Sequence, residues 1–340
     1  MTEGTTPAAT TTSPASYPQL IDITMGLYRS RALAVAVELD ISGQLAEGPL
    51  AVDVLAAKTG THAPSLFRLL RALASIGVFQ QVRPGVFANS PVSTLLQKGV
   101  PGSFWAAIRM GAMITFNAWA ELASSIRTGK PSFDKVNGQN IWQFLAQKPE
   151  AAAVFDEAMR SVTGPATSAV TAAYDWSKTP VIADIGGGIG TQLVSILDAH
   201  TDCRGILFDT PEVVGRAIPH ERIVGRPGDM FETIPAGADA YILRLIIHDW
   251  PEPQALSILS NVRMAMNPGS RLMLIEVLVP ETEGVNYGVW TDLGMMVLAG
   301  GRERSATEYR ELLASAGFDT EQIVPTNSMF SIIVAKPTAA

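Results

Sequence analysis

Two different patterns of hydrophobic positions divide this chain. From about residue 20 to residue 175, apolar residues recur at spacings of three and four, which places them on one face of an α-helix. One such run consists of Leu66, Leu69, Leu70, Leu73 and Ile76. From Pro180 onward, short apolar runs alternate with helical patterns. Such alternation is typical of a mostly parallel, doubly wound sheet, so we expect a helical N-terminal part and an α/β C-terminal part.

A hairpin is predicted within the helical part, at residues 77–91. The stretch "GVFQQVRPGVFANSP" carries apolar pairs on both sides of an Arg-Pro-Gly turn, as β-hairpins do. Helices followed by such a hairpin predict a winged-helix unit over about residues 20–100. Seven Lys and Arg face five Asp and Glu in that range, whereas a DNA-binding domain usually presents a more basic surface. We therefore expect helix–helix dimerisation and not DNA binding.

The apolar runs of the C-terminal part predict its strands. These runs are "VIADIGGG" (181–188), "GILFDT" (205–210), "DAYILRLIIH" (239–248), "RLMLIEVLVP" (271–280) and "SMFSIIVAKP" (328–337), with a further strand ending near "GDMF" (228–231). Ser305 and Glu308 have the spacing of a capping box. They predict the start of a helix that ends near Gly317, because glycine commonly terminates helices.

Composition and charge narrow the class of protein. The net charge is −7 and the isoelectric point is about 5.2, which argues against nucleic acid as a partner because its phosphates attract basic surfaces. No stretch approaches the roughly 18 consecutive apolar residues of a membrane span. Cys203 is the single cysteine, so an internal disulfide is excluded. A soluble protein that binds neither nucleic acid nor membranes is expected.

The first 18 residues differ from the rest of the chain. They are rich in Thr, Ala and Pro and lack the basic start and apolar core of a secretory signal. We interpret residues 1–18 as a disordered tail. Without a secretory signal, the expected location is the cytoplasm.

A glycine-rich loop follows the first predicted strand. In "DIGGGIG", which starts at Asp184, glycines occupy positions 186, 188 and 190 before a helix. This arrangement lets a ligand approach the backbone at a helix N-terminus. A dinucleotide fingerprint would have its third glycine one residue later, where the chain has Thr191. Asp184 would also repel a pyrophosphate, whereas its carboxylate suits an ammonium group. An NAD-dependent dehydrogenase is therefore disfavoured.

Two further acidic residues extend this candidate site. Asp209 ends the next predicted strand, 19 residues after Gly190, where an acidic side chain can accept hydrogen bonds from ribose hydroxyls. In "GDMF", Asp229 can accept a hydrogen bond from an adenine amino group, and Met230 can lie on the face of the ring. An amino acid, a ribose and an adenine in series describe S-adenosylmethionine (SAM).

The order of these motifs resembles that of a known family. The stretches "DIGGGIG", "FDTPEV", "GDMF", "LRLIIHDW", "LIEVLVP" and "GGRERSATEYRELLASAGF" are similar to those of class I small-molecule O-methyltransferases. Caffeate, flavonoid and acetylserotonin O-methyltransferases and bacterial natural-product enzymes belong to that group. The resemblance covers roughly residues 20–337. It implies a homodimer in which a Rossmann-like α/β domain binds SAM and releases S-adenosylhomocysteine.

The resemblance also implies a domain organisation. The expected parts are a tail (1–18), an all-α, winged-helix dimerisation domain (19–100), a helical substrate-binding segment (101–175) and a Rossmann-like catalytic domain (176–340). The family sheet ends in an antiparallel strand.

The resemblance assigns roles in catalysis. His248 of "HDW" matches the general base of the family, and Glu276 and Glu303 match two acidic residues beside it. A carboxylate near a histidine raises the histidine pKa and fixes the ring orientation, which helps it to accept a proton from a phenol. Arg244 matches a basic residue beside the cofactor. We expect Asp249 to cap the following helix, with a position near the cofactor as the alternative.

The resemblance further implies residues that contact the methyl acceptor. Phe155 and Met159 match a Phe and a Met that touch the substrate ring, and Asp292 and Met296 lie in a helix lining the same pocket. Trp119 is a weaker candidate. Leu298 lies near the position where plant relatives often have Asn, which leaves polar recognition of a plant-type acceptor open.

No metal site is expected. The four histidines, at positions 62, 200, 220 and 248, are scattered and cysteine is single, whereas metal sites gather such ligands at short spacings. The leading hypothesis is therefore a metal-independent methyl transfer from SAM to an aromatic hydroxyl, with a phenol as the first choice. N-methylation, cyclase- or hydroxylase-like chemistry that keeps SAM, and a winged-helix regulator that senses a small ligand stay as alternatives.

Overall fold

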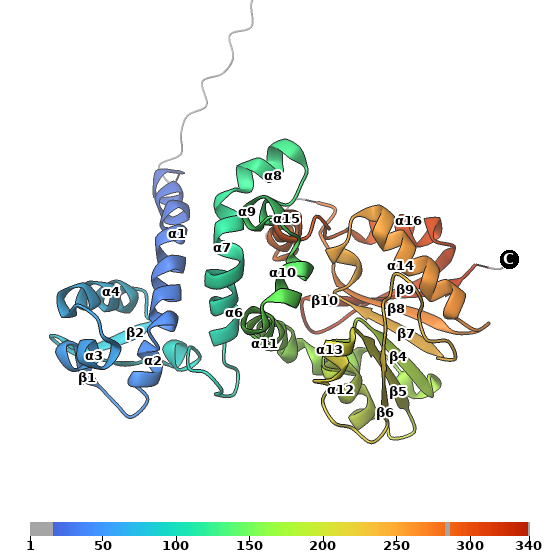
Figure 1. Ribbon diagram of the computed structural model, residues 1–340, viewed down its shortest axis with the longest axis horizontal. Coiled ribbons are helices and arrows are strands. Elements are labelled where there is room, and N and C mark those ends of the chain that lie inside the picture. Colours follow the sequence, from blue (N-terminus) through green and yellow to red (C-terminus); the bar gives the residue numbers. More distant parts are fainter. Residues whose placement is uncertain (1–15, 283–285, 339–340) are drawn as a thin grey trace, which may run out of the picture. The chain divides into compact units, whose positions relative to one another are not determined.

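The computed structural model describes residues 16–282 and 286–338 (Figure 1). The described chain divides into two compact units between Ala112 and Met113. Residues 1–15 of the expected tail lie outside the described residues, and the first helix begins at Ser16, three residues before the expected domain boundary. Within the described residues, no helix combines the length and the apolar character that crossing a membrane requires.

The N-terminal unit consists of helices around a small sheet. Its elements are α1 (Ser16–Glu38), α2 (Ile41–Gln44), β1 (Leu50–Ala51), α3 (Val52–Thr59), α4 (Ala63–Ser75), β2 (Phe79–Arg83), β3 (Val86–Asn89), α5 (Pro91–Thr94) and α6 (Trp105–Met110). Strands β2 and β3 pair antiparallel, and β1 adds to β3. The predicted hairpin is thus confirmed. Leu70, Leu73 and Phe87 are fully or almost fully buried in the core of this unit.

Part of α1 is apolar and exposed. Leu20, Ile23 and Leu27 are 62%, 66% and 61% exposed. Their spacing of three and four residues places them on one side of the helix. A contiguous exposed apolar stripe is uncommon on a monomeric protein and is typical of a surface that binds another protein.

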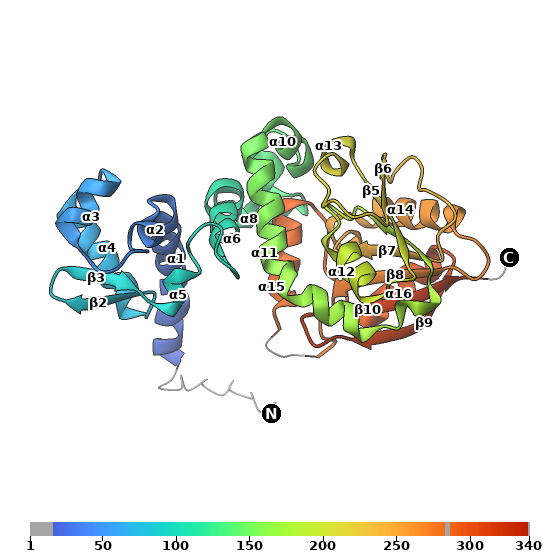
Figure 2. The same ribbon diagram turned by 90° about the horizontal axis from the view of Figure 1, so that it is seen from below.

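Helices precede the sheet of the C-terminal unit. They are η1 (Gly111–Thr115), α7 (Phe116–Ala120), α8 (Leu122–Thr128), α9 (Ser132–Asn137), α10 (Ile141–Gln147), α11 (Pro149–Ala173) and η2 (Trp176–Lys178). Helix α11 packs along α12 (Thr191–Ala199) (Figure 2). The long helix therefore connects this helical segment to the sheet that follows.

A seven-stranded mixed sheet forms the centre of the C-terminal unit. Its strands are β4 (Val181–Ile185), β5 (Arg204–Asp209), β6 (Ile223–Pro227), β7 (Ala240–Arg244), β8 (Arg271–Val277), β9 (Phe318–Pro325) and β10 (Phe330–Pro337). The spatial order is β6-β5-β4-β7-β8-β10-β9, and only β10 and β9 run antiparallel to their neighbours. The predicted doubly wound sheet is confirmed, and β9 is a strand that the sequence analysis did not identify.

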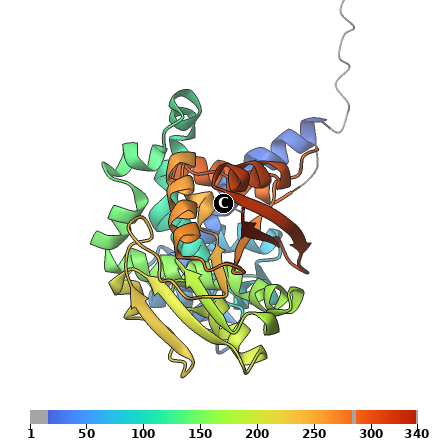
Figure 3. The same ribbon diagram turned by 90° about the vertical axis from the view of Figure 1, so that its right-hand side faces the viewer.

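Helices cover both faces of this sheet (Figures 1 and 3). The helices that follow α12 are α13 (Pro211–Val214), η3 (Ile247–Asp249), α14 (Glu252–Ala265), α15 (Gly288–Leu298) and α16 (Ala306–Ser315). Helices α14 and α16 pack on one face, and α11 and α12 on the other. The capping box predicted at Ser305 and Glu308 is present at the start of α16.

Strand β8 places a carboxylate in an apolar layer. Side chains alternate between the two faces of a strand, so Leu272 and Leu274 enter one core and Met273 and Ile275 enter the other. By the same alternation Glu276 shares the face of Leu272 and Leu274, and it is fully buried. A carboxylate in such a layer needs partners, because burying a charge without them is costly.

The strand predicted at residues 239–248 is shorter than expected. It was predicted to reach residue 248, but β7 ends at Arg244. Leu245 has a φ of 56°, a left-handed conformation that is unfavourable for most residues and that turns the chain out of the strand direction. Ile247–Asp249 then forms the short 3₁₀ helix η3. His248 therefore lies on a tight turn beyond the strand end.

Candidate active site

The glycine loop begins where β4 ends. Gly186, Gly188 and Gly190 have φ values of 65°, 60° and 88°, in the left-handed region that glycine adopts most easily. The amide of Gly186 donates to the carbonyl of Phe208 at 2.8 Å. A Cβ at Gly186 would lie 2.5 Å from the side chain of Ile246. The loop therefore needs glycine both for its conformation and for the close approach of its neighbours.

Asp184 is a buried carboxylate facing this loop. It is 1% exposed, and a Cβ at Gly187 would lie 2.6 Å from its carboxyl carbon. Neither carboxylate oxygen has a hydrogen-bond partner among the described residues. Burial raises the pKa of Asp184 to about 7, against the opposing charge of Arg244. A buried acceptor without a donor is unfavourable, so this position suits a ligand that brings a positively charged donor.

Arg244 ends the adjacent strand, β7. Its guanidinium donates to the hydroxyl of Thr167 at 3.0 Å and to the carbonyl of Thr163 at 2.8 Å. Burial lowers the pKa of Arg244 to about 10, which still leaves it charged at neutral pH. The side chain is thus held between α11 and the sheet, where its charge acts on Asp184.

Asp209 and Asp229 continue the same edge. The carboxylate of Asp209, at the end of β5, accepts from the amides of Gly188 at 2.9 Å and Thr210 at 2.7 Å. Asp229 follows β6 and accepts from the amide of Phe231 at 2.8 Å. Because β4, β5 and β6 are parallel neighbours, their carboxyl ends lie at one edge. Met230 lies there too, with its carbonyl accepting from Asn261 at 2.9 Å.

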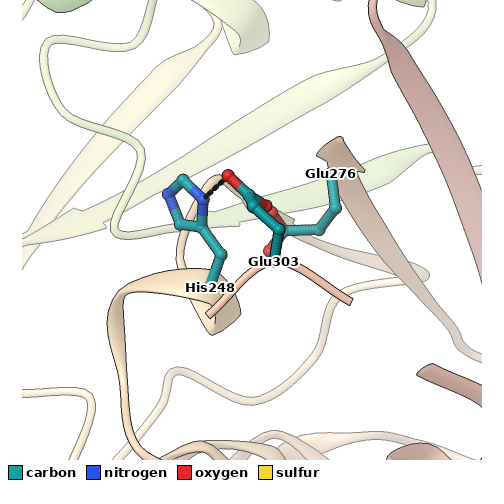
Figure 4. A group of neighbouring side chains, drawn as sticks. All are labelled: His248, Glu276 and Glu303. Atoms are coloured by element: carbon teal, nitrogen blue, oxygen red, sulfur yellow. Dashed lines mark hydrogen bonds and ion pairs between the residues drawn. The ribbon is translucent and has the colours of Figure 1, made fainter. Parts of the chain in front are cut away.

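A histidine is paired with a glutamate in the buried cluster shown in Figure 4. The Nδ1 atom of His248 lies 2.9 Å from Oε1 of Glu303. A carboxylate only accepts hydrogen bonds, so Nδ1 is the donor. Oε1 of Glu276 accepts from the amide of Ile247 at 3.1 Å. The residue before the histidine and the histidine ring are therefore each held by a different glutamate.

The charges of this cluster shift its proton affinities. Burial lowers the pKa of His248, but the carboxylates of Asp249, Glu276 and Glu303 outweigh it and raise the pKa to about 10. Burial also raises the pKa of Glu276 to about 8 and that of Asp249 to about 6, against the attraction of His248. The fold has thus turned an ordinary imidazole into a stronger base.

Asp249 does not have the expected role. The N-cap position of α14 is occupied by Pro251 and no side chain caps this helix. The carboxylate of Asp249 instead lies 3.6 Å from Nε2 of His248. The 3₁₀ turn of Ile247–Asp249 explains the difference, because it directs the carboxylate back to the ring. The expectation of a capping residue is therefore wrong, and both ring nitrogens face carboxylates.

Two residues that hold Glu303 in place were missed or assigned differently. A Cβ at Gly301 would overlap the carbonyl oxygen of His248, so the turn after α15 can touch η3 only with glycine at this position. Asp292 on α15 was expected near the acceptor, and its Oδ1 accepts from the amide of Glu303 at 2.9 Å. The paired glycines of "GGRERS" were a usable signal of a tight turn. They did not show what the turn contacts, because residue 248 is distant from them in the sequence.

The remaining expected acceptor contacts lie on three helices. Phe155 and Met159 are on α11, Trp119 is on α7 and Met296 is on α15. All four are partly buried. Trp119 approaches α15, where a Cβ at Gly294 would lie 3.8 Å from its ring.

Phe155 belongs to a row of aromatic rings. It packs edge-on against Trp142, with the ring centroids 6.1 Å apart. Trp142 stacks on Trp250 at 5.7 Å, and Trp250 packs edge-on against Phe231 at 4.7 Å. The row connects α11 with the residue two positions after His248. Trp142 and Trp250 were not among the expected site residues, because their contact depends on the placement of α10.

The expectation of no metal site stays a prediction. It rested on scattered histidines and a single cysteine. Within the described residues, the fold brings ligand atoms of His248 and of two carboxylates, Glu276 and Glu303, within 4.8 Å of one another. The closest two of these groups are already hydrogen-bonded to each other.

Gly301→Ala tests the close contact with the turn that carries His248. The added methyl group overlaps the carbonyl oxygen of His248, and such overpacking costs about 1–3 kcal/mol or more. We expect a clear drop in the urea midpoint of unfolding. Gly164→Ala serves as the control, because a Cβ there meets nothing within 4 Å and, like Gly301, Gly164 has no left-handed φ. Equal stability of the Gly301 variant and the wild type would contradict the contact.

Glu303→Gln tests the electrostatic coupling. The change removes a negative charge that favours the imidazolium, so we expect the pKa of His248 to fall by roughly one unit or more. NMR titration of the histidine ring protons measures this directly. The other three histidines serve as internal controls for the measurement. An unchanged pKa for His248 would show that Glu303 does not act on it.

Comparisons with known proteins give the family. The O-methyltransferase domain model matches residues 119–319, and the O-methyltransferase dimerisation domain model matches residues 21–99. A phenazine O-methyltransferase of Lysobacter antibioticus is 39% identical over 325 residues, covering 94% of this chain and 95% of that protein. A mitomycin biosynthesis 6-O-methyltransferase of Streptomyces lavendulae is 38% identical over 315 residues, with 89% of each chain covered.

Solved structures agree with this assignment. The structure of human N-acetylserotonin methyltransferase in complex with SAM aligns with a TM-score of 0.89 at 28% identity, covering 97% of this chain and all of that one. The regulator and dehydrogenase alternatives have no support from these matches. The chain belongs to the O-methyltransferase family and is a SAM-dependent O-methyltransferase with the family's dimerisation domain.

Proposed function

We propose that this enzyme methylates a phenolic hydroxyl of an aromatic small molecule, with His248 as the general base and without a metal ion. The observation that carries the proposal is the buried contact between Nδ1 of His248 and Glu303 at 2.9 Å. In the neutral ring, Nδ1–H donates its hydrogen bond to Glu303 and the lone pair lies on Nε2. That lone pair is available to a hydroxyl group. Because the carboxylates raise the pKa of His248 to about 10, the neutral form requires a nearby cationic cofactor, which lowers that pKa, or alkaline pH.

The cofactor site is proposed at the carboxyl edge of the sheet. The residues that would hold SAM are Asp184, Gly186, Gly188, Asp209, Asp229, Met230 and Arg244. The two unpartnered oxygens of Asp184 suit the ammonium of the methionine part, and Asp209 and Asp229 offer acceptors for ribose and adenine. When bound, SAM supplies a methyl group on a positively charged sulfur, which is electrophilic.

The pKa of the base supports the assignment of His248. A phenol has a pKa of about 10 and a free histidine about 6.5, so full proton transfer between them would cost about 5 kcal/mol. The carboxylates raise the pKa of His248 to about 10, which removes most of that gap. Binding of a cationic cofactor at this edge lowers the pKa again, because like charges disfavour protonation. The deprotonated oxygen then attacks a sulfonium, and charge is neutralised in the process.

The acceptor pocket is proposed between α7, α11 and α15. Trp119, Phe155, Met159 and Met296 would surround the ring, whereas Asp292, which was also expected there, has its Oδ1 bonded to the amide of Glu303. Aromatic and methionine side chains suit a flat, apolar ring system. The two relatives are named for phenazine and mitomycin. We therefore infer an acceptor with fused or substituted aromatic rings.

His248→Ala tests the base. We expect wild-type enzyme to transfer labelled methyl groups from SAM to members of a panel of catechols, flavonoids, quinones and polyketide phenols. The variant should keep its SAM affinity by calorimetry and lose about 10²–10⁴-fold in turnover, the usual contribution of a general base. His220→Ala is the control because it lies outside the cluster. All assays contain EDTA, so wild-type turnover also tests metal independence.

Two outcomes would contradict this proposal. Full turnover of His248→Ala would remove the base from its role. Loss of wild-type turnover in EDTA, restored by a divalent cation, would show that a metal ion takes part.

A homodimer through the N-terminal unit is proposed as well. The match to the dimerisation domain covers residues 21–99, and α1 exposes an apolar stripe of Leu20, Ile23 and Leu27. Association buries such a stripe, and the loss of apolar surface from water drives it at about 25 cal/mol per Å². The occupant that we propose is a second copy of this chain.

Leu20→Asp combined with Leu27→Asp tests the dimer. Charges in an apolar interface cannot be solvated there, so we expect the double variant to elute as a monomer in size-exclusion chromatography with light scattering. Arg29→Asp places an acidic side chain on the opposite side of the same helix, where Arg29 is 45% exposed, and should leave the dimer intact. A dimer that persists in the double variant would exclude this face of α1 from the interface.

A further inference from the structure

Glu303 receives a second, separate hydrogen bond through its backbone. While its carboxylate binds His248, its amide donates to Oδ1 of Asp292 at 2.9 Å. Asp292 lies on α15, eleven residues earlier in the chain. One helix therefore fixes the backbone of the residue whose side chain orients the base.

The segment between α15 and Glu303 has little freedom. Gly300 has a φ of 77°, and Gly301 lies directly against the backbone of residues 248–250. After Glu303, the carbonyl of Arg304 accepts from the amide of Val279 at 3.1 Å, which attaches this segment to the end of β8. Asp292 thus supplies the side-chain anchor at the amide of Glu303 itself.

The charges around Asp292 agree with a role in contacts within the protein. Burial raises its pKa, the hydrogen bond from the Glu303 amide lowers it, and the carboxylates of Glu303 and Glu308 oppose the charge of Arg302. The groups that act on His248 are Asp249, Glu276 and Glu303. Asp292 is joined to this set through its hydrogen bond with the Glu303 amide, which is the route by which we expect it to act on the histidine.

We infer that Asp292 is a positioning residue: its carboxylate holds the backbone of Glu303 so that the Glu303 carboxylate stays on Nδ1 of His248. The inference rests on the proposed function, in which His248 is the base. This role differs from a contact with the methyl acceptor. It requires an atom at residue 292 that accepts a hydrogen bond, and it does not require a charge. Asparagine keeps such an acceptor and alanine does not.

The matched pair Asp292→Ala and Asp292→Asn tests this role. In the alanine variant the Glu303 amide loses its partner, and we expect kcat to fall by about 10- to 100-fold, as misplacement of catalytic groups by about 1 Å does. Because Glu303 then raises the His248 pKa less, the limb of the pH–kcat profile that reports the base should move down by roughly one unit. The KM values for SAM and for the acceptor should change little.

Asp292→Asn should recover most of the lost kcat and restore the pH profile. Glu281→Ala is the control, because Glu281 also accepts from a backbone amide, that of Thr307, at 3.1 Å but lies away from the cluster. It should leave the pH profile unchanged. If Asp292→Ala does not fold, Asp292→Ser replaces it, because serine is too short to reach the same amide.

The inference would be overturned if the asparagine variant were as impaired as the alanine variant and both had a raised KM for the methyl acceptor. That result would mean that the charge of Asp292 binds the methyl acceptor. An unchanged kcat and pH profile in the alanine variant would overturn it as well. NMR titration of the His248 ring in these variants measures the His248 pKa, and so tests the positioning of Glu303 without a turnover assay. Failure of the proposed base would instead appear as turnover in His248→Ala, whatever the Asp292 variants do.

Discussion

The contact between His248 and Glu303 is the interaction on which the site depends. Buried charges are tolerated only in pairs with good geometry, so the two side chains must be held rigidly. Glu276 holds the amide before His248, Asp292 holds the amide of Glu303, and Gly301 permits the close approach of the two turns. Several segments that are distant in sequence therefore have to fold together before the histidine becomes a strong base.

The parallel sheet places this base near the proposed cofactor site. Parallel strands end at the same edge, and ligands in such folds bind beyond their carboxyl ends. Asp184 lies one residue before the end of β4, Asp209 ends the adjacent strand β5, and Arg244 ends β7 on the other side of β4. The oxygens of Asp184 are buried without a hydrogen-bond partner among the described residues, which is costly. That cost is a reason to regard the residue as part of a binding site and not of the core.

Much of the fold followed from local patterns. Apolar runs identified five of the strands of the sheet, and the capping box at Ser305 located α16, because strand and helix periodicity and capping act over a few residues. Strand β9 escaped because only Phe318 in it is buried, so its pattern resembles a surface segment. The predicted end of β7 was also wrong, since the apolar run continues through the left-handed Leu245 into η3.

The sequence by itself determined most of the elements and the glycine loop, because each depends on neighbours within one element, and the resemblance of its motifs to a known family supplied the catalytic candidates. Only the tertiary structure decided which groups face His248. It turned Asp249 toward Nε2 and brought Asp292 to the Glu303 amide. It also joined Trp142 to Trp250. These contacts connect residues through turns and helix placement, and side-chain spacing in a sequence carries no information about the direction in which a turn sends the chain.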